Sequence, residues 1–459
     1  MSLFIPDDPR PIHFVGIAGA GMSALALIAM SRGVTVSGCD SDSHAASEMT
    51  ELGMPVTVGH DAGHVSGSRA VVYTSAVSED HPELVAAREA GIPVLKRAAA
   101  LQAAIEGGRT VAVAGTHGKT TTTVMTAAAL SAAGMDPTAI VGGTVAEWGG
   151  NARIGRQDLF VVEADEYDKS FLQLYPDVAV VNNIEADHLE CYGSVGNIEA
   201  AFAEFAGRAH RVLVGSDDPG AVRVARAIRQ PTWRVGLAPD ADLRLSTVER
   251  QPEGSSARLR LPDGTTVGLE LRLPGLHNIR NAAMAVGVVA ALDGDVEAGA
   301  QALREFVGVA RRFQILGTIA GVTVVDDYAH HATEVAATLG AARQRFPDNR
   351  LVAVFQPHLF SRTQAQGQAL GIVLSVADLV VVTDVYPARE QPIRGVTGKI
   401  VAKAARAAGA RVEWVERLSD LPPVLCGLVQ RGDVVLTLGA GDITQIGPAL
   451  LNQLAGAAA

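Results

Sequence analysis

The sequence predicts an α/β protein of about three domains, each built on a mainly parallel sheet. Short apolar runs alternate with alanine-rich segments of helical length along most of the chain, the pattern of strands and helices that follow one another in turn. Most apolar runs end in glycine-rich or polar turns. The length of 459 residues suits about three domains if one domain takes roughly 150 residues.

The composition limits the possible function classes. Aromatic residues make up only 4% of the chain, so alanine, valine and leucine must fill its cores. A formal charge of -11 argues against a nucleic-acid binder but leaves room for local anion sites. The three cysteines (Cys39, Cys191 and Cys426) lack metal-ligand or paired spacing, and we expect reduced thiols. No signal peptide or membrane-spanning run is visible, which predicts a cytoplasmic protein that does not enter the membrane.

The first segment combines a short strand, a glycine-rich turn and an apolar helix. The turn carries Gly16, Gly19 and Gly21 in the order G-x-x-G-x-G, whereas a dinucleotide fingerprint is G-x-G-x-x-G. Asp40 follows at about the spacing of a ribose contact, roughly 20 residues on. We interpret the turn as a diphosphate site at a helix N-terminus. A tight helix–sheet contact that needs small residues is the alternative.

The second segment contains a phosphate loop of unusual spacing. An apolar run from Val111 leads into the loop, and an alanine-rich helix follows it. Lys119 would reach the outer phosphates of a nucleotide, and the Thr120 hydroxyl would bind Mg²⁺. Only two residues separate Gly115 from the Gly-Lys pair, where the common loop has four, which disfavours a generic kinase or GTPase. The predicted ATP ligands are Gly115, Thr116, His117, Gly118, Lys119, Thr120 and Thr121.

Acidic and imidazole side chains follow two further predicted strands. One run ends at Glu163, within the acidic turn 163–168, and another leads to His188. The site of an open α/β sheet lies outside the carboxyl ends of its strands, so both residues are expected to face the phosphate loop. With Thr120, they would hold one or two Mg²⁺ ions, although imidazole is an unusual ligand for so hard a cation. A solvated acidic turn is the alternative.

Residues 240–273 alternate apolar and polar side chains around a Pro-Asp-Gly-Thr turn, which predicts a small antiparallel hairpin. The helix after it carries His277, Asn278 and Asn281 within about one turn. These side chains could read a purine edge, or they could cap the helix.

The third segment follows the pair Arg311-Arg312, which could bind phosphate through its guanidinium groups or be solvated. Four apolar runs come next, and polar residues follow each of them. Four polar strand ends on one sheet edge predict a binding face. The polar turns that would form it are residues 326–331, 356–363, 384–386 and 439–442.

Together these motifs resemble the Mur ligase family, the ATP-dependent amino-acid ligases of peptidoglycan precursor synthesis. The pattern is most similar to the members that add L-alanine to UDP-N-acetylmuramate. The motifs are GIAGAGMS (16–23), AGTHGKTTTT (114–123), EADEYD (163–168), NNIEADHLECYGS (182–194), LPGLHNIRNA (273–282), RRFQ (311–314), DDYAHH (326–331) and FQPHLFSRT (355–363).

The resemblance implies three domains. Residues 1–107 would form a Rossmann-like domain that binds the UDP-sugar. Residues 108–311 would form a P-loop ATPase-like domain with the small antiparallel element, and residues 312–459 a Rossmann-like domain that binds the amino acid.

The resemblance also implies residue roles. The UDP-sugar would contact Gly16, Gly19, Gly21, Met22, His60 and Ser75. ATP would contact the loop and, from other segments, His277, Asn278, Asn281 and Arg312. Thr120, Glu163 and His188 would hold Mg²⁺. The catalytic set would be Lys119, Arg312, Asp327, His330, His358 and Arg362.

The implied reaction joins L-alanine to the lactyl carboxylate of UDP-N-acetylmuramate through an acyl phosphate, with ADP and phosphate as products. The partners would be small molecules only, and the chain a monomer or weak homodimer. The chain departs from the family pattern at Leu359, where some members have arginine, and at Ala332, where proline is frequent. It also has no lysine between Lys169 and Lys399 that could be carbamylated to hold a second Mg²⁺, as in several related ligases.

Three other functions remain open at this point. A sister ligase would add another amino acid or recycle a muropeptide. An NAD-dependent oxidoreductase would use the turn at Gly16–Gly21, although the order of its glycines argues against this. A non-catalytic nucleotide switch would leave the polar strand ends of the third segment unexplained.

Overall fold

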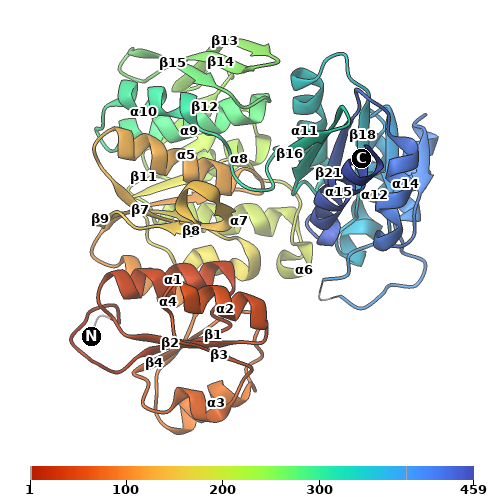
Figure 1. The fold of residues 1–459 in the computed structure, drawn as a ribbon. Helices are drawn as coiled ribbons and strands as arrows, with labels where there is room; N and C mark the ends of the chain where they lie inside the picture. The colour runs from red at the N-terminus through yellow and green to blue at the C-terminus, as the bar shows by residue number, and fades with distance from the viewer. Residues whose placement is uncertain (1–2, 389, 459) are drawn as a thin grey trace. The chain divides into compact units, whose positions relative to one another are not determined.

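The computed structural model describes residues 3–388 and 390–458. They form two compact units. Unit 1 holds the chain up to Thr247 together with Arg258–Leu269 and Arg280–Arg304, and unit 2 holds Val248–Ala257, Glu270–Ile279 and the chain from Glu305. Three sheets organise the molecule (Figure 1). Each predicted domain range contains one sheet, and the division at 107 and 311 stays a prediction.

The N-terminal sheet is entirely parallel, with strand order β3-β2-β1-β4-β5. Helices α1, α2 and α4 lie on one face and α3 on the other (Figure 1). The strands are β1 (Ile12–Val15), β2 (Val36–Asp40), β3 (Val56–Val58), β4 (Ala70–Tyr73) and β5 (Val94–Lys96). The helices are α1 (Ala20–Ser31), α2 (Ser43–Glu51), η1 (Ala62–Val65), α3 (Pro82–Glu89) and α4 (Arg97–Ile105).

The central sheet has the order β15-β14-β13-β12-β11-β10-β6-β9-β7-β8. Its strand β6 (Arg109–Ala114) pairs in parallel with β10 and β9 and is buried from Thr110 onward, as expected for a strand covered on both faces. The other strands are β7 (Pro137–Val145), β8 (Gly150–Arg153), β9 (Arg156–Glu163), β10 (Val178–Val181), β11 (Arg211–Gly215), β12 (Thr232–Gly236), β13 (Leu243–Gln251), β14 (Gly254–Arg260) and β15 (Thr266–Leu271).

The helices of this region are α5 (Lys119–Ala132), η2 (Ala146–Trp148), η3 (Tyr167–Gln173), α6 (Leu189–Tyr192), α7 (Val195–Gly207), α8 (Pro219–Ala227), α9 (Leu276–Ala291), α10 (Val296–Ala302) and η4 (Leu303–Glu305). A single hydrophobic core contains Leu25 of α1 together with Ala112 of β6 and Phe160 of β9. This shared core explains why the first two predicted domains form one compact unit.

The predicted hairpin lies at β14 and β15. Burial alternates along both strands, and the chain reverses where the Leu261 N–H donates to the Thr265 carbonyl at 2.8 Å. One face of this element is therefore apolar and the other solvated, as the alternating sequence indicates.

The C-terminal sheet has the order β16-β17-β21-β18-β19-β20 and is parallel except for the edge pair β16–β17. Separate apolar clusters cover its two faces. The strands are β16 (Gln314–Ile319), β17 (Val322–Asp327), β18 (Leu351–Phe355), β19 (Leu379–Val382), β20 (Val412–Trp414) and β21 (Val434–Leu438). The helices are α11 (Ala332–Arg345), α12 (Phe360–Leu374), α13 (Lys399–Ala407), η5 (Leu418–Asp420), α14 (Leu421–Leu428), η6 (Asp442–Gln445) and α15 (Ile446–Ala458).

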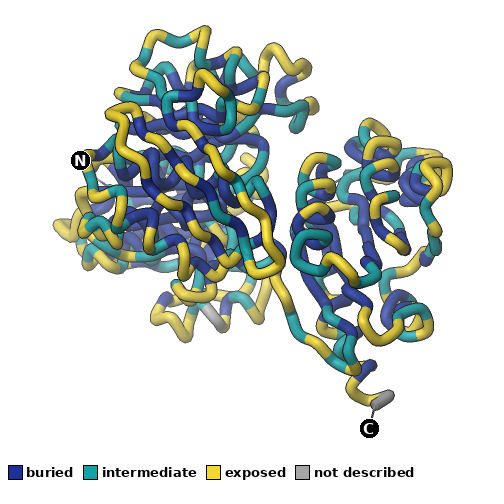
Figure 2. The backbone as a smooth tube through the Cα atoms, turned by 90° about the horizontal axis from the view of Figure 1, so that it is seen from above, coloured by how far each residue is buried: buried dark blue, intermediate teal, exposed yellow. Residues whose placement is uncertain are grey.

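The predicted α/β fold with mainly parallel sheets is confirmed. Buried segments run through the interior of each unit, while turns and outer helix faces are exposed (Figure 2). Across residues 3–388 and 390–458, no helix combines the length and hydrophobicity that a bilayer crossing requires.

Candidate active site

The phosphate loop connects β6 to α5 through two glycines with positive φ. Gly115 has φ +144° and Gly118, the residue before α5, has φ +79°. L-amino acids with side chains rarely adopt these conformations. No side chain caps the first turn of α5, which leaves its N–H groups to an anionic ligand placed at the positive end of the helix dipole.

Asn281 on α9 lies beside this loop. A Cβ atom added at Gly118 would meet the Asn281 Oδ1 atom at 2.8 Å and the Asn182 Nδ2 atom at 3.2 Å. Only glycine suits position 118, because the backbone there is left-handed and the neighbouring amides leave no room for a Cβ atom. The structure thus places Asn281, a predicted ATP ligand, beside the loop, and its contact with ATP stays a prediction.

The turn after β10 holds the loop in place. The Thr116 N–H donates to the Asn183 carbonyl at 3.0 Å, and the His117 N–H donates to the Asn183 Oδ1 atom at 2.8 Å. The Asn182 amide donates to the Thr122 hydroxyl at 3.0 Å. Neither asparagine was predicted as a site residue, although two adjacent amides after an apolar strand are a signal that the sequence contains.

Lys119 is folded over the loop. Its Nζ atom lies 2.7 Å from the Gly115 carbonyl and 2.7 Å from the Glu166 Oε1 atom. Burial lowers the pKa of Lys119, but the carboxylates of Glu166, Glu163 and Asp165 together raise it by more, so the net shift is upward and the amine stays charged. Glu166 was not singled out by the sequence analysis, because the motif 163–168 offers four carboxylates.

Two of the three predicted metal ligands are in direct contact. The Thr120 hydroxyl donates to the Glu163 Oε1 atom at 3.0 Å, and the Gly142 N–H donates to Oε2 at 2.7 Å. His188 has φ +52° and lies 3.4 Å from the Glu190 carboxylate through its Nδ1 atom. Its membership of the metal site stays a prediction.

The N-terminal turn is shaped by Asp40, whose Oδ2 atom accepts the Ala18 N–H at 3.0 Å. This contact explains Asp40 without a ribose. Ser75 is exposed just after β4. The Met22 side chain lies in the hydrophobic core and its N–H donates to the Gly19 carbonyl, so the side chain has a structural role.

Arg97 joins the N-terminal turn to the acidic turn of the ATP region. A Cβ atom added at Gly21 would lie 2.8 Å from the Arg97 guanidinium, and that guanidinium lies 3.3 Å from Asp165. Arg97 was not predicted as a site residue, because it begins α4 without a recognisable motif. A guanidinium between a glycine-rich turn and a carboxylate is well placed to contact a bound anion.

Arg312 and Asp327 lie at the ends of two strands of unit 2: Arg312 precedes β16, and Asp327 is the last residue of β17. The Arg312 guanidinium lies 5.2 Å from the centre of the Tyr328 ring, and the buried Asp327 carboxylate accepts the N–H groups of Phe313 and Ala329 at 2.8 and 2.7 Å. Burial raises the pKa of Asp327 to about 6.

Three further residues of the predicted catalytic set lie together in unit 2. The rings of His330 and His358 have centroids 5.7 Å apart, and the Arg362 guanidinium lies 3.2 Å from the His358 Nδ1 atom. Arg362 is buried at the first turn of α12. Leu359, the departure from the family pattern, precedes this helix with φ +67°, a conformation that strains a leucine.

Of the predicted adenine-side residues, Asn278 donates its amide to the Pro274 carbonyl at 2.7 Å. This bond ties the Asn278 side chain to the turn before α9, and its contact with adenine stays a prediction. His277 follows Gly275 and crowds it: a Cβ atom on that glycine would lie 2.4 Å from the imidazole.

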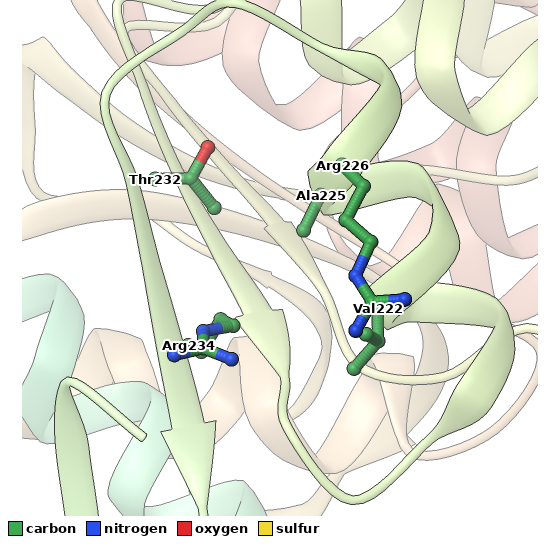
Figure 3. A pocket seen from close by; sticks show the side chains of 5 residues that line it. All are labelled: Val222, Ala225, Arg226, Thr232 and Arg234. Carbon is green, nitrogen blue, oxygen red and sulfur yellow. The ribbon is translucent and has the colours of Figure 1, made fainter. Parts of the chain in front are cut away.

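A surface pocket lies apart from these residues, between α8 and β12 (Figure 3). It is lined by Val222, Ala225, Arg226, Thr232 and Arg234. Arg234 pairs with Asp240 at 2.7 Å, and none of the predicted site residues lines this pocket.

Profiles of three Mur ligase domains match successive parts of the chain. The Mur ligase family catalytic domain matches residues 11–109, the Mur ligase middle domain matches 113–289, and the Mur ligase glutamate ligase domain matches 311–441. The chain belongs to the Mur ligase family. This confirms the family resemblance of the sequence motifs.

Among its relatives, this Mur ligase is 46% identical to UDP-N-acetylmuramate–L-alanine ligase of Paenarthrobacter aurescens and 44% identical to that of Streptomyces avermitilis. Each alignment covers 97% of both chains. The UDP-N-acetylmuramate–alanine ligase of Thermotoga maritima has a similar structure, with a TM-score of 0.82 and 31% identity over 97% of this chain and 99% of that one.

Proposed function

We propose that this Mur ligase joins L-alanine to the lactyl carboxylate of UDP-N-acetylmuramate at the expense of ATP, a step in peptidoglycan precursor synthesis. The observation that carries the proposal is the 44–46% identity, over 97% of both chains, to relatives that bear this activity in their names. The phosphate loop and the histidine–arginine cluster of unit 2 supply the groups that such a reaction needs.

The loop and Lys119 bind the ATP phosphates. In the structure the Lys119 amine donates hydrogen bonds to loop carbonyls and to Glu166. It is therefore positioned and charged before the nucleotide binds. The Thr120 hydroxyl and Glu163 carboxylate are hard oxygen donors 3.0 Å apart, a donor set that fits Mg²⁺. When bound, Mg²⁺ offsets the charge of the phosphates.

The first chemical step activates the sugar carboxylate. A carboxylate oxygen attacks the γ-phosphorus, the bond from that phosphorus to ADP breaks, and an acyl phosphate forms. Lys119 stabilises the charge that develops on the transferred group, since positioning and electrostatics dominate phosphoryl transfer. Arg97, which lies between the N-terminal turn and Asp165, helps to hold the sugar nucleotide.

The second step forms the amide bond. The neutral amine of L-alanine attacks the acyl carbon, phosphate leaves, and one proton is lost from nitrogen. Arg362 pairs with the L-alanine carboxylate, and His330 and His358, which lie beside it, are the candidates to accept the proton. Arg312 and Asp327 act on the ATP side of the reaction.

The test is amino-acid-dependent release of phosphate by the purified chain. With UDP-N-acetylmuramate, ATP and Mg²⁺ present, L-alanine should stimulate release, and mass spectrometry should detect the UDP-N-acetylmuramoyl-alanine product. Release with another amino acid or a peptide, and none with L-alanine, would assign the chain to a sister or recycling ligase. A Lys119→Ala variant should be inactive, while the exposed-lysine control Lys403→Ala keeps full activity.

We further propose a cytoplasmic enzyme that works as a monomer or weak homodimer, because its substrates are water-soluble small molecules. Sedimentation at several protein concentrations tests the assembly state. A stable higher oligomer would contradict it.

A further inference from the structure

A second cluster of polar side chains lies in the N-terminal sheet, outside the proposed reaction. His13 on β1 and Cys39 on β2 project from one face of the sheet, where α3 and η1 cover them and contribute Glu83 and His64. Val15 and Leu84 pack in the same layer. Figure 1 shows α3 on this face, opposite α1, α2 and α4. Three of the four side chains are almost fully buried: His13 is 2% exposed, and Cys39 and Glu83 are 0% exposed.

The donor atoms of the four side chains converge on one point. All lie within 4.8 Å of one another. The Cys39 sulfur lies 3.0 Å from the Glu83 Oε2 atom, and the His64 Nδ1 atom lies 2.9 Å from Oε1. The His13 Nε2 atom lies 3.5 Å from Oε2. Four elements of the chain therefore direct sulfur, nitrogen and oxygen toward a shared centre.

The hydrogen bonds within the cluster leave one buried nitrogen atom, Nε2 of His13, without a partner among the described residues. The His13 Nδ1 atom is 2.9 Å from the Ser37 hydroxyl, which fixes the ring, whereas its buried Nε2 atom has no hydrogen-bond partner among the described residues. The Cys39 thiol can donate a hydrogen bond to Glu83, but this bond does not give the His13 Nε2 atom a partner. When one ring nitrogen of a histidine binds a metal, a hydrogen bond at the other ring nitrogen orients the ring, and here the Ser37 hydroxyl makes that bond with Nδ1.

The chemistry of the donors selects the ion. A thiolate, two imidazoles and one carboxylate are typical zinc ligands, whereas Mg²⁺ and Ca²⁺ prefer oxygen alone. One thiolate and one carboxylate also carry the two negative charges that balance Zn²⁺ when both imidazoles are neutral. The site would then be electrically neutral, which favours its burial.

We propose that His13, Cys39, His64 and Glu83 form a structural zinc site in the N-terminal domain. Four protein ligands leave no open position for a substrate, as in other closed zinc sites. The ion ties β1, β2, η1 and α3 together and so stabilises the region that carries the Gly16–Gly21 turn. His60, whose Nδ1 atom lies 3.2 Å from the Cys39 sulfur, donates to the bound thiolate. The sequence predicts only a reduced thiol at Cys39, because the four ligands come from four separate elements and show no metal-ligand spacing.

The experiment measures zinc on the full chain. The protein is stripped with a chelator and titrated with Zn²⁺ against a chromophoric competitor, with excess Mg²⁺ present to fill the ATP site. We expect about one tightly bound zinc per chain. Co²⁺ in its place should give the charge-transfer band of a thiolate ligand and the visible bands of a tetrahedral ion.

Two variants and two controls locate the ion. Cys39→Ser should abolish the thiolate band, and both Cys39→Ser and His64→Gln should weaken zinc binding by about 100-fold or more, since loss of even an outer-shell partner costs roughly 10–100-fold. Cys191→Ser and His210→Gln replace a cysteine and a histidine outside the cluster, and should leave binding unchanged. His64 is partly exposed, so its variant tests the site even if Cys39→Ser fails to fold.

Thermal unfolding gives an independent readout. Zinc should raise the melting temperature of the stripped wild-type chain and leave that of Cys39→Ser unchanged. Absence of tight zinc binding, a Co²⁺ spectrum without a thiolate band, or zinc binding that both cluster variants retain would each overturn the proposal.

Discussion

The buried ion pair of Lys119 and Glu166 gives a prediction that can be worked through from the structure. The Nζ–Oε1 distance is 2.7 Å, and the side chains are 17% and 6% exposed. The Glu166 Oε2 atom has no hydrogen-bond partner among the described residues, so Lys119 is its main counter-charge. A Lys119→Met variant keeps the apolar stem of the lysine but leaves this carboxylate buried without it.

Removal of one partner from a buried pair costs about 3–5 kcal/mol, much more than the net worth of the pair. A change of 1 kcal/mol moves the melting temperature of a domain of this size by roughly 2–4 °C. The melting temperature of Lys119→Met should therefore fall by about 6–20 °C. In the double variant Lys119→Met/Glu166→Gln the buried charge is gone, and most of that loss should be recovered.

The assay is thermal unfolding of the wild type, both single variants and the double variant. The exposed control Lys403→Met should melt with the wild type. The charged lysine stabilises the fold fully below the unfolded lysine pKa of about 10.4, and this is lost only as pH rises through the higher folded pKa. The difference in melting temperature between Lys119→Met and the wild type should thus stay the same from neutral pH to about pH 9. If Lys119→Met melts like the control, or the double variant melts no higher than Lys119→Met, the pair does not carry this energy.

Three further predictions concern the other groups of the site. Glu163→Gln should raise the Mg²⁺ concentration for half-maximal phosphate release by about tenfold or more, with the exposed Glu253→Gln as control. An unchanged Mg²⁺ titration would remove Glu163 from the metal site. Arg362→Ala should raise the KM for L-alanine by roughly 10–100-fold and that for ATP far less, a loss of about 1.5–3 kcal/mol, whereas exposed Arg394→Ala should change neither. Equal effects on both substrates would count against its carboxylate role. Since burial raises the pKa of Asp327 from 3.8 to about 6, its protonated form favours the fold, and this stabilisation fades as pH rises through that window. From well below pH 3.8 to well above pH 6, the wild type should therefore lose about 3 kcal/mol in total relative to Asp327→Asn, seen as a pH-dependent difference in melting temperature. A constant difference would contradict the buried acid.

Local sequence patterns predict the strands and the loop because their signals lie within a few residues. The run from Val111 into Gly115 and Lys119 needs only apolar residues followed by glycine and a helix former, and the structure has β6, the loop and α5 there. The polar strand ends of unit 2 are equally predictable from local sequence, because each is an apolar run followed by polar residues. Strands that run parallel place their carboxyl ends at one edge, so His330 and His358 come together as expected.

Contacts between distant segments were not predictable from the same patterns. The acidic turn offers several carboxylates, and only the packing of η3 against its neighbours decides that Glu166 meets Lys119. Arg97 begins an ordinary alanine-rich helix. Cys39 and Glu83 lie 44 residues apart on a strand and a helix, and a sequence does not show which face of the strand that helix will cover.

The confinement of Gly118 has a consequence for inhibitor design. Its backbone is left-handed and the space at its Cβ position is filled by Asn281, so any other residue there would strain the turn and collide with a neighbouring amide. A compound that draws its affinity from the main chain of this loop would meet a target with few single-substitution routes to resistance. Compounds that rely on the exposed side chain of Ser75 would lack that protection, because a surface position tolerates replacement.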